Sequence, residues 1–241
     1  ENNKIRMEEQ IKYLTKSLED VKINMEKKEK ELESFRTEII KYKTMENEHT
    51  MLKDLSVKNE IDHWSDEAEQ CKSKKFTSAT KTVMEKTAIR FAKENNIRLS
   101  IILPTGLYGQ AILPEHMHHN PFAWLNRVIE GGQPRHETTP NDSASMIHLE
   151  DLANLFLAAY ENPNATGRYF GVFDSLHWQD IYAECQKILP NMKMPKPMSE
   201  KAVAPTGFDF SRRDSLGVKI RDFPTLLRET IEWLQTHPFH K

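Results

Sequence analysis

The sequence predicts an α/β fold with a parallel sheet, preceded by a long coiled-coil helix. Three observations predict it. Apolar residues repeat every seven positions near the N-terminus, all 12 prolines and all 8 glycines lie at or after Pro104, and predicted strands alternate with helices in the later part. Proline and glycine are the residues that interrupt regular structure most strongly. Residues 1–103 therefore lack the main helix breakers, whereas the rest of the chain has ordinary turn chemistry.

Residues 1–60 are predicted to form a coiled-coil helix and a linker. In five heptads from Met7 to Tyr42, ten of the eleven core positions are apolar, and Lys28 is the exception. A stripe of two apolar positions in seven needs a second helix to bury it. Self-association or a partner helix is therefore expected through residues 1–45. The alternative is a single solvated helix, stabilised by charge pairs three and four residues apart.

Residues 61–241 are predicted to form the α/β domain. Helical periodicity over Phe76–Asn95 predicts a helix with a buried side made by Val83, Met84, Ala88, Ile89, Phe91 and Ala92. Later apolar runs predict three strands, at Ile97–Leu103, Met146–Leu149 and Arg168–Phe173. Amphipathic patterns predict three further helices, at Asp151–Glu161, Trp178–Ile188 and Thr225–Thr236. This alternation favours a parallel sheet.

Composition excludes several classes of function. A net charge of -2 gives no basic surface for nucleic acid or for an anionic membrane. No apolar run is long enough for a membrane span, and no signal peptide is recognisable. Cys71 and Cys185 are too few and too far apart for a disulfide framework or a zinc site, which favours a reducing compartment. A cytoplasmic location is expected.

Other polar clusters are interpreted as structural. The segment Pro114–His119 holds three histidines, but no further ligands stand at a recognisable spacing, so no metal site is predicted. His148, on a predicted strand, is interpreted as a hydrogen-bonded core residue. Arg212 and Arg213 are interpreted as surface charges that begin a helix, the alternative being contacts to an anionic substrate or a cofactor phosphate.

Several segments, in order, resemble one enzyme family: residues 64–66 (WSD), 71–75 (CKSKK), 81–86 (KTVMEK), 98–106 (RLSIILPTG), 146–153 (MIHLEDLA), 210–217 (FSRRDSLG) and 227–234 (LRETIEWL). Residues 61–241 resemble the C-terminal half of an extended short-chain dehydrogenase/reductase. This is the NAD-dependent epimerase/dehydratase superfamily, and the similarity is to dihydroflavonol and cinnamoyl-CoA reductases. The resemblance implies part of a Rossmann-type fold, and an oxidoreductase that transfers hydride between NAD or NADP and a small carbonyl or alcohol.

The resemblance also implies a site. The family places a tyrosine four residues before a lysine, so that the lysine lowers the pKa of the phenol, ordinarily near 10, and binds the nicotinamide ribose. Lys81 matches that lysine, but Thr77 stands at the tyrosine position. A threonine hydroxyl is too short and too weak an acid to replace the phenol. The family seats the nicotinamide amide on backbone that corresponds here to Pro104, Thr105 and Gly106.

One part of the family pattern is missing. Its members open with a strand, a glycine-rich turn and a helix that hold the pyrophosphate, whereas the first glycine here is Gly106. A catalytically impaired NAD(P)-dependent reductase is therefore expected. The alternative is a non-catalytic coiled-coil interaction protein that carries a reductase remnant. A truncated or fused gene product is a further alternative, and the start of the chain at Glu1 is consistent with a fragment.

Overall fold

The computed structural model describes residues 57–238 and five residues before them: Met25, Lys27, Lys28, Lys30 and Glu33. The chain divides into two units, Glu1–Asp54 and Leu55–Lys241. The five described residues of the first unit are helical and exposed. Most of the predicted heptad positions lie outside the described residues. The coiled coil, and the domain boundary expected near residue 60, therefore stay predictions.

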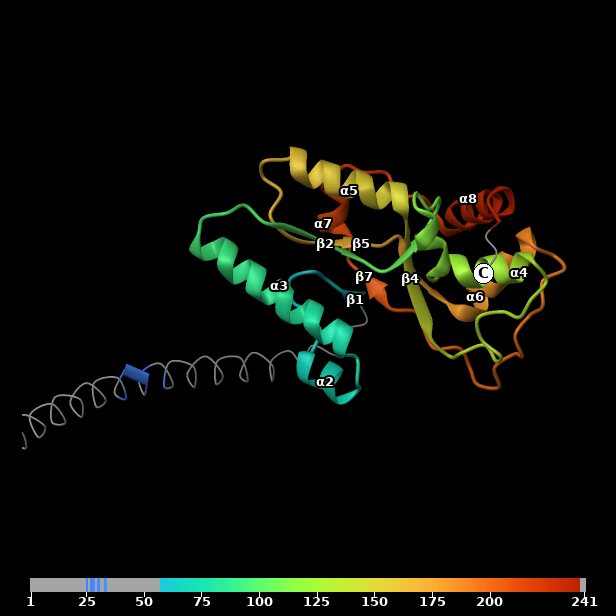
Figure 1. The fold of residues 1–241 in the computed structure, drawn as a ribbon, viewed down its shortest axis with the longest axis horizontal. Helices are drawn as coiled ribbons and strands as arrows, with labels where there is room; N and C mark the ends of the chain where they lie inside the picture. The colour runs from blue at the N-terminus through green and yellow to red at the C-terminus, as the bar shows by residue number, and fades with distance from the viewer. Residues whose placement is uncertain (1–24, 26, 29, 31–32, 34–56, 239–241) are drawn as a thin grey trace, which may run out of the picture. The chain divides into compact units, whose positions relative to one another are not determined.

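The second unit has the expected mixed α/β architecture with parallel strands (Figure 1). Its strands form three small sheets. β1 (Val57–Lys58) pairs in parallel with β7 (Gly207–Phe208), and β2 (Ser100–Pro104) pairs in parallel with β5 (Gly167–Gly171). In the third sheet, β4 (Ser143–His148) lies between β3 (Gly106–Tyr108), to which it is parallel, and β6 (Asp174–His177), to which it is antiparallel. The fold class predicted from the alternating pattern is confirmed.

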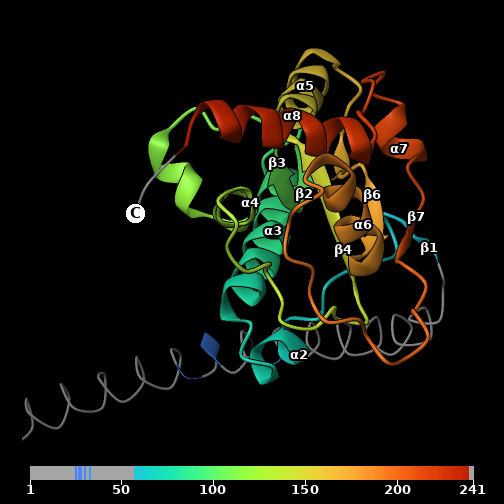
Figure 2. The same cartoon turned by 90° about the vertical axis from the view of Figure 1, so that its right-hand side faces the viewer.

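Helices surround these sheets (Figure 2). They are α2 (Glu67–Lys72), α3 (Phe76–Glu94), the 3-10 helix η2 (Pro114–His118), α4 (Phe122–Ile129), α5 (Leu149–Glu161), α6 (Trp178–Ile188), α7 (Ser211–Asp214) and α8 (Phe223–Thr236). The sequence predicted α3, α5, α6 and α8 to within two residues at each end. It did not predict α2 or α4, and α7 spans only four residues. The Asp222 side chain caps α8 by accepting from the Thr225 amide at 2.9 Å.

Two apolar clusters lie on either side of β4. One gathers α4, α6 and α8 around Trp124, Met146 and Tyr182. The other places α5 over β2 and β5, around Ile102, Ile147 and Leu155. Successive side chains of a strand point to opposite faces, so Met146 and Ile147 enter different clusters. In this way β4 joins the two clusters, and its carboxyl end, at His148, lies where they meet.

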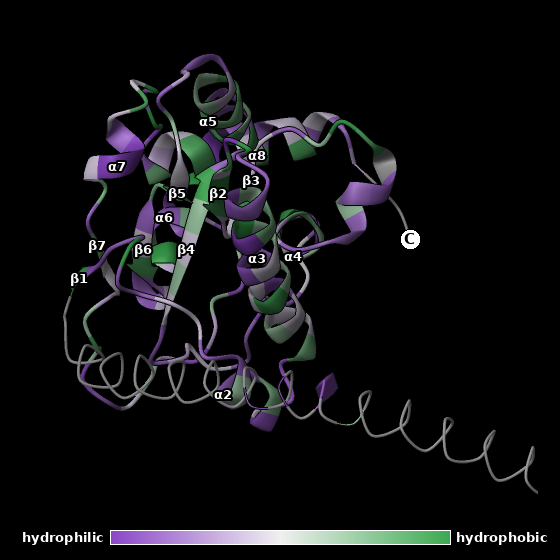
Figure 3. Cartoon of the chain, turned by 90° about the vertical axis from the view of Figure 1, so that its left-hand side faces the viewer, coloured by the Kyte–Doolittle hydropathy of each residue, from purple (hydrophilic) through white to green (hydrophobic). Residues whose placement is uncertain are grey.

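The face that was predicted to be buried on α3 is mostly exposed. Val83, Met84, Ala88 and Phe91 are exposed, and Ile89 is half-buried. The side chains that α3 does bury belong to Ala79, Thr82 and Ala92. Of the predicted set, therefore, only Ala92 is fully buried. The physical reason is that α3 packs mainly against α2, and within residues 57–238 nothing covers its apolar side, part of which is green in Figure 3.

Candidate functional site

Thr77 and Lys81, the pair expected at the site, both lie on α3. They are four residues apart, so they stand one turn apart on the same side of the helix. Both side chains are exposed, and neither forms a hydrogen bond or ion pair with another residue of the described part of the chain. The structure thus leaves Lys81 free to meet a ligand, while the hydroxyl beside it cannot act as a phenol.

No described tyrosine takes the place of the missing phenol on α3. Tyr108, Tyr169 and Tyr182 are buried, and Tyr160 is an exposed residue of α5. Burial raises the pKa of the Tyr108 phenol far above its usual value of about 10. Burial also raises the pKa of Tyr182, whose hydroxyl oxygen lies 2.9 Å from Nδ1 of His136. The buried phenols of Tyr108, Tyr169 and Tyr182 serve as core residues rather than as proton donors to a ligand.

Pro104, Thr105 and Gly106 link the carboxyl end of β2 to the start of β3. Pro104 and Thr105 are exposed, and a side chain at Gly106 would meet the backbone oxygen of Ser145 at 3.1 Å. In open parallel sheets, ligands bind beyond the carboxyl ends of the strands. The loop therefore has the position expected of a nicotinamide contact. Within residues 57–238, no hydrogen bond joins this loop to Lys81 or Thr77.

The residues present do not fit a whole dinucleotide. Pyrophosphate binding needs free amides at a helix N-terminus that follows a strand. α5 and α6 follow β4 and β6 directly, but the first turn of α5 carries Glu150 and Asp151, and that of α6 carries Asp180. These carboxylates oppose a phosphate through charge repulsion. The N–H of Gly109 is also taken, because it donates to Thr230 Oγ1 at 2.8 Å.

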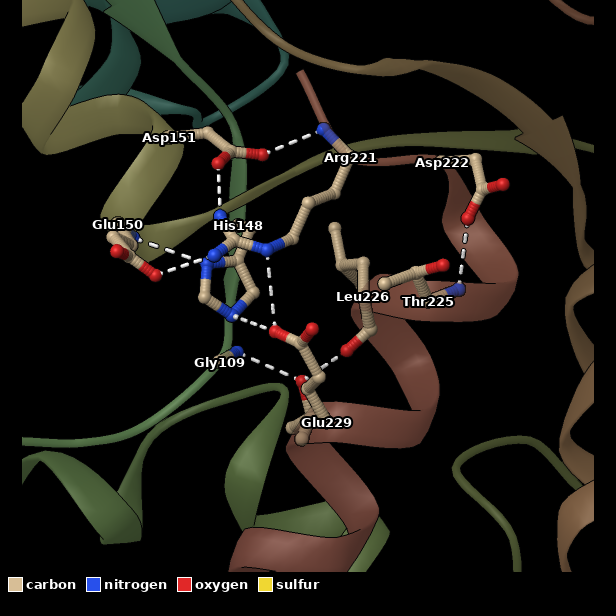
Figure 4. A network of polar contacts seen from close by, with 10 residues as sticks. Gly109, His148, Glu150, Asp151, Arg221, Asp222, Thr225, Leu226 and Glu229 are labelled. Atoms are coloured by element: carbon tan, nitrogen blue, oxygen red, sulfur yellow. Dashed lines mark hydrogen bonds and ion pairs between the residues drawn. The ribbon is translucent and has the colours of Figure 1, made fainter. Parts of the chain in front are cut away.

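A polar cluster occupies the carboxyl end of β4 (Figure 4). The His148 side chain caps α5, since its Nδ1 accepts from the Glu150 amide at 3.2 Å. Arg221 forms ion pairs with three carboxylates, those of Asp151, Glu150 and Glu229, and its backbone N–H donates to Asp151 at 2.7 Å. The cluster ties the segment before α8 and α8 itself to β4 and α5.

The pKa of His148 lies below its usual value, chiefly because the imidazole is buried. Burial lowers the pKa of the imidazole, and the Arg221 cation lowers it further, against the opposing effect of the nearby carboxylates. Because Nδ1 accepts a hydrogen bond, the proton of the neutral ring sits on Nε2. Nε2 lies 3.3 Å from Glu229 Oε2, without the alignment of a hydrogen bond. The interpretation of His148 as a core histidine agrees with this geometry.

The remaining polar candidates have structural surroundings. His116, His118 and His119 are exposed, and no group of three metal-ligating side chains occurs in the described part of the chain. Arg213 is buried, not a surface residue as expected, and it donates to the backbone oxygens of Val172 and Phe173. Arg212 likewise donates to the oxygens of Arg168 and Thr166. Neither guanidinium is left free for a phosphate.

One cavity lies away from the expected site. Its volume is about 540 Å³, and it lies between α3 and the amino ends of β2 and β5, where Ile89, Arg98 and Gly167 line it. Thr77, Lys81 and the loop 104–106 do not line it. Of the arginines that line it, Arg98 donates to the last turn of α5, and Arg168 forms an ion pair with Glu85. Among the described residues, no helix is long and apolar enough to cross a membrane.

Comparisons with known proteins show which proteins the chain resembles. No family model matches the chain. A cinnamoyl-CoA reductase of Medicago truncatula is 29% identical over 179 residues, which are 73% of this chain and 53% of that protein. Other curated relatives are dihydroflavonol reductases. The chain is similar to these reductases. It spans about half the length of the curated relatives that it matches first.

Solved structures show the same fold. Vestitone reductase from alfalfa superimposes with a TM-score of 0.62 at 18% identity, over 77% of this chain and 60% of that one. Yeast methylglyoxal/isovaleraldehyde reductase, solved with NADPH, superimposes with a TM-score of 0.52 at 20% identity, over 65% of this chain and 54% of that one. The expected similarity to extended short-chain reductases is confirmed. The rest of each solved chain lies outside the alignment with this chain.

Proposed function

We propose that residues 61–241 form the substrate-side half of an NAD(P)-dependent reductase, and that this chain does not turn over a substrate by itself. The observation that carries the proposal is the exposed Lys81, one helical turn from Thr77 and without an ion-pair partner among residues 57–238. Lys81 would hold the nicotinamide ribose, and the backbone of Pro104–Gly106 would meet the nicotinamide amide. Hydride transfer from the bound nicotinamide is the chemistry that the cofactor would supply.

The proposed lack of turnover follows from the missing acid. Reduction of a carbonyl needs a proton at the carbonyl oxygen as hydride arrives at carbon, and a positioned phenol beside a cation can supply it. Thr77 has neither the reach nor the acidity for this role. Within residues 57–238, α5 and α6, the helices that directly follow strands, begin with acidic residues that disfavour a pyrophosphate. Small-molecule carbonyl compounds or the corresponding alcohols are the proposed substrate class, and NAD or NADP the cofactor.

Titration of the purified chain with NADH and NADPH tests the proposal. We expect weak binding, seen at millimolar cofactor as a change in nicotinamide fluorescence and a rise in melting temperature. Lys81→Met should abolish both signals, whereas Lys74→Met, an exposed change outside α3, should leave them unchanged. If millimolar cofactor produces no signal with the unmodified chain, the proposal is wrong.

Restoring the phenol tests the assignment of the site. Thr77→Tyr places a tyrosine four residues before Lys81, and turnover with a panel of simple ketones is expected to rise above that of the unmodified chain. Thr80→Tyr is the matched control, because it adds the same side chain to an exposed position of α3 at the wrong spacing. Equal activity in both variants would contradict the assignment of Thr77 and Lys81.

The second candidate is a non-catalytic interaction protein, which the heptads before Tyr42 and the threonine at position 77 favour. In that case the first unit would drive association, and the reductase-like unit would be a binding or inert module. Leu18→Lys, in the predicted seam, should then convert a concentration-dependent oligomer into a monomer in sedimentation experiments. A chain that is monomeric at high concentration before any substitution would exclude this candidate.

A further inference from the structure

The outer edge of β2 is open. Within residues 57–238, β2 pairs with β5 alone. The Gly167 N–H donates to the Leu99 oxygen at 2.8 Å, so the backbone groups of Leu99 and of every second residue after it point toward β5. The N–H and C=O groups of Ser100 and Ile102 therefore point away from β5. They form an unpaired edge of the kind to which another strand can add.

A two-stranded parallel sheet is an incomplete structure. Parallel strands occur almost exclusively in sheets that helices cover on both faces, and a pair of strands is marginal by itself. Figure 1 shows β2 and β5 lying between α5 and α3, which is the layering of a larger α/β/α sandwich. The apolar side chain of Ile102 is buried at this edge of the molecule. Among the described residues, β2 is therefore the last strand of this layered structure on its side.

The helix on one side of this layer has an unpartnered apolar face. Four large apolar side chains of α3 are between 45% and 64% exposed: Phe76, Val83, Met84 and Phe91. At 100° per residue these four positions fall on one side of the helix. Of the residues that α3 buries, Thr82 and Ala92 fall on the other side, whereas Ala79 lies at the border of the exposed face. Four large apolar side chains exposed on one side of a helix indicate an interaction surface.

The helix on the opposite side shows the same feature. Three large side chains of α5 are between 52% and 77% exposed: Phe156, Leu157 and Tyr160. They lie within about 100° of one another around the helix axis, with the buried Leu152 at the border of this face and the buried Leu155 farther round the helix. Exposed apolar faces therefore occur on both helices that flank the open strand. One partner that extends the sheet would cover all three features.

We propose that the edge of β2, together with the exposed faces of α3 and α5, binds the complementary half of a reductase fold. That half would add a strand parallel to β2 and apolar helix faces on both sides. The relatives argue for this occupant, since the chain aligns with only 60% of vestitone reductase and with 53% of the Medicago cinnamoyl-CoA reductase. The identity of the occupant rests on the proposed function, whereas the open edge and the exposed faces do not.

A second copy of the chain fits this surface less well. A symmetric pair uses the same patch on both copies, so two β2 edges would meet each other. Two copies would then bring two sets of exposed helix faces but no additional strand between them. Within residues 57–238 of each copy, α5 and α6, the helices that directly follow strands, would again begin with acidic residues. Only a half of different structure completes both the sheet and the cofactor site.

Co-expression tests the proposal. The probe is the segment of the Medicago truncatula cinnamoyl-CoA reductase that this chain does not match, produced together with the full chain of 241 residues. We expect a one-to-one complex in sedimentation, and slower hydrogen exchange at the amides of Ser100 and Ile102 than in the chain alone. Neither measurement involves a cofactor, so they test the docking surface separately from the proposed function. A complex that forms but does not bind NADPH would contradict the proposed function and leave the docking surface supported.

Exposed substitutions locate the surface. The double variant Met84→Glu and Phe91→Glu should weaken the complex by about tenfold or more, because it places charge in an apolar contact. Ile112→Glu is the matched control, as Ile112 is exposed outside these helices, and it should leave the affinity unchanged. Melting curves of the free variants verify that each remains folded.

Three results would overturn the proposal. The first is that the probe does not co-purify with the chain. The second is a complex whose affinity does not respond to the Met84 and Phe91 substitutions. The third is that the chain alone forms a dimer that the same double variant dissociates, because this would make a second copy the occupant. A dimer that persists in the double variant forms through another surface, for example the predicted coiled coil. In that case the affinity of the double variant for the probe decides whether the proposal holds.

Discussion

Arg168 of β5 and Glu85 of α3 form an ion pair in which Nε of the arginine lies 2.6 Å from Oε1 of the glutamate. Both side chains are largely buried. Arg168 also donates to the backbone oxygens of Glu60 and His63, and its guanidinium lies 3.8 Å from the centre of the Trp64 ring. Since α3 buries few side chains, this pair is a principal polar link between the helix of Lys81 and the sheet.

Removing the charge of Glu85 should loosen α3. The Glu85→Gln variant keeps the shape of the side chain but loses a charged hydrogen bond, which costs about 1.5–3 kcal/mol of unfolding free energy. Hydrogen exchange should accelerate over Phe76–Glu94 more than elsewhere. Glu94→Gln, at an exposed position of the same helix, should change neither quantity. Exchange in α3 that matches the unmodified chain would show that Glu85 does not hold the helix.

Gly109 should resist substitution because of His148. Its φ is +112°, and a Cβ at this position would lie 2.7 Å from Nε2 of the buried imidazole. Gly131 also has a positive φ, +79°, but nothing lies within 4 Å of its Cβ position. Gly109→Ala should therefore lower the unfolding free energy by about 1–3 kcal/mol more than Gly131→Ala, the amount typical of overpacking. Urea unfolding of the two variants gives the comparison, and equal losses would contradict the predicted clash.

The helices were the most predictable part of the fold. Trp178–Ile188 carries apolar residues at helical spacing and forms a helix with those bounds, because its apolar side meets the core directly. The strands β3 and β6 were not predictable, since β3 spans three residues and β6 has the polar sequence Asp-Ser-Leu-His. Pairing with β4, which the local sequence does not specify, makes both of them strands.

The exposed face of α3 shows a different limit of sequence patterns. Periodicity identifies the apolar side of a helix, but not whether an element is present to cover it. Val83 and Phe91 fit the pattern of buried residues and lie exposed for this reason. The site was predictable as far as the family resemblance reached, which gave Thr77 and Lys81. The polar cluster was not, because Arg221 lies 70 residues beyond Asp151 in the chain.

The two cysteines should react at very different rates. Cys71 is exposed and Cys185 is buried, and burial raises the pKa of the Cys185 thiol to about 12. Only the thiolate attacks thiol reagents at an appreciable rate. A disulfide reagent at neutral pH should therefore modify one thiol quickly and the second only after denaturant is added. Cys71→Ser should remove the fast phase, and a fast phase that survives in this variant would contradict the burial of Cys185.

His148 should make stability depend on pH. Burial and the Arg221 cation lower the pKa of the imidazole in the folded chain, although Asp151, Glu229 and Glu150 act in the opposite direction. The unfolded chain, in which a histidine has a pKa of about 6.5, therefore binds the proton more readily than the folded chain. The contribution of His148 to the unfolding free energy is then constant above neutral pH and falls as the pH drops below about 6.5.

Urea unfolding between about pH 7.5 and 5 measures this dependence. His148→Gln removes the titrating group while an amide oxygen can still accept from the Glu150 N–H, so the decline should become shallower. Part of the decline should remain, since burial also lowers the pKa of His136, and His136→Gln in the same background should reduce it further. Asp222, whose hydrogen bonds to Thr225 lower its pKa, titrates below this range and does not interfere. A slope unaffected by His148→Gln would mean that the imidazole titrates equally in both states, and this would contradict the lowered pKa of His148 in the folded chain.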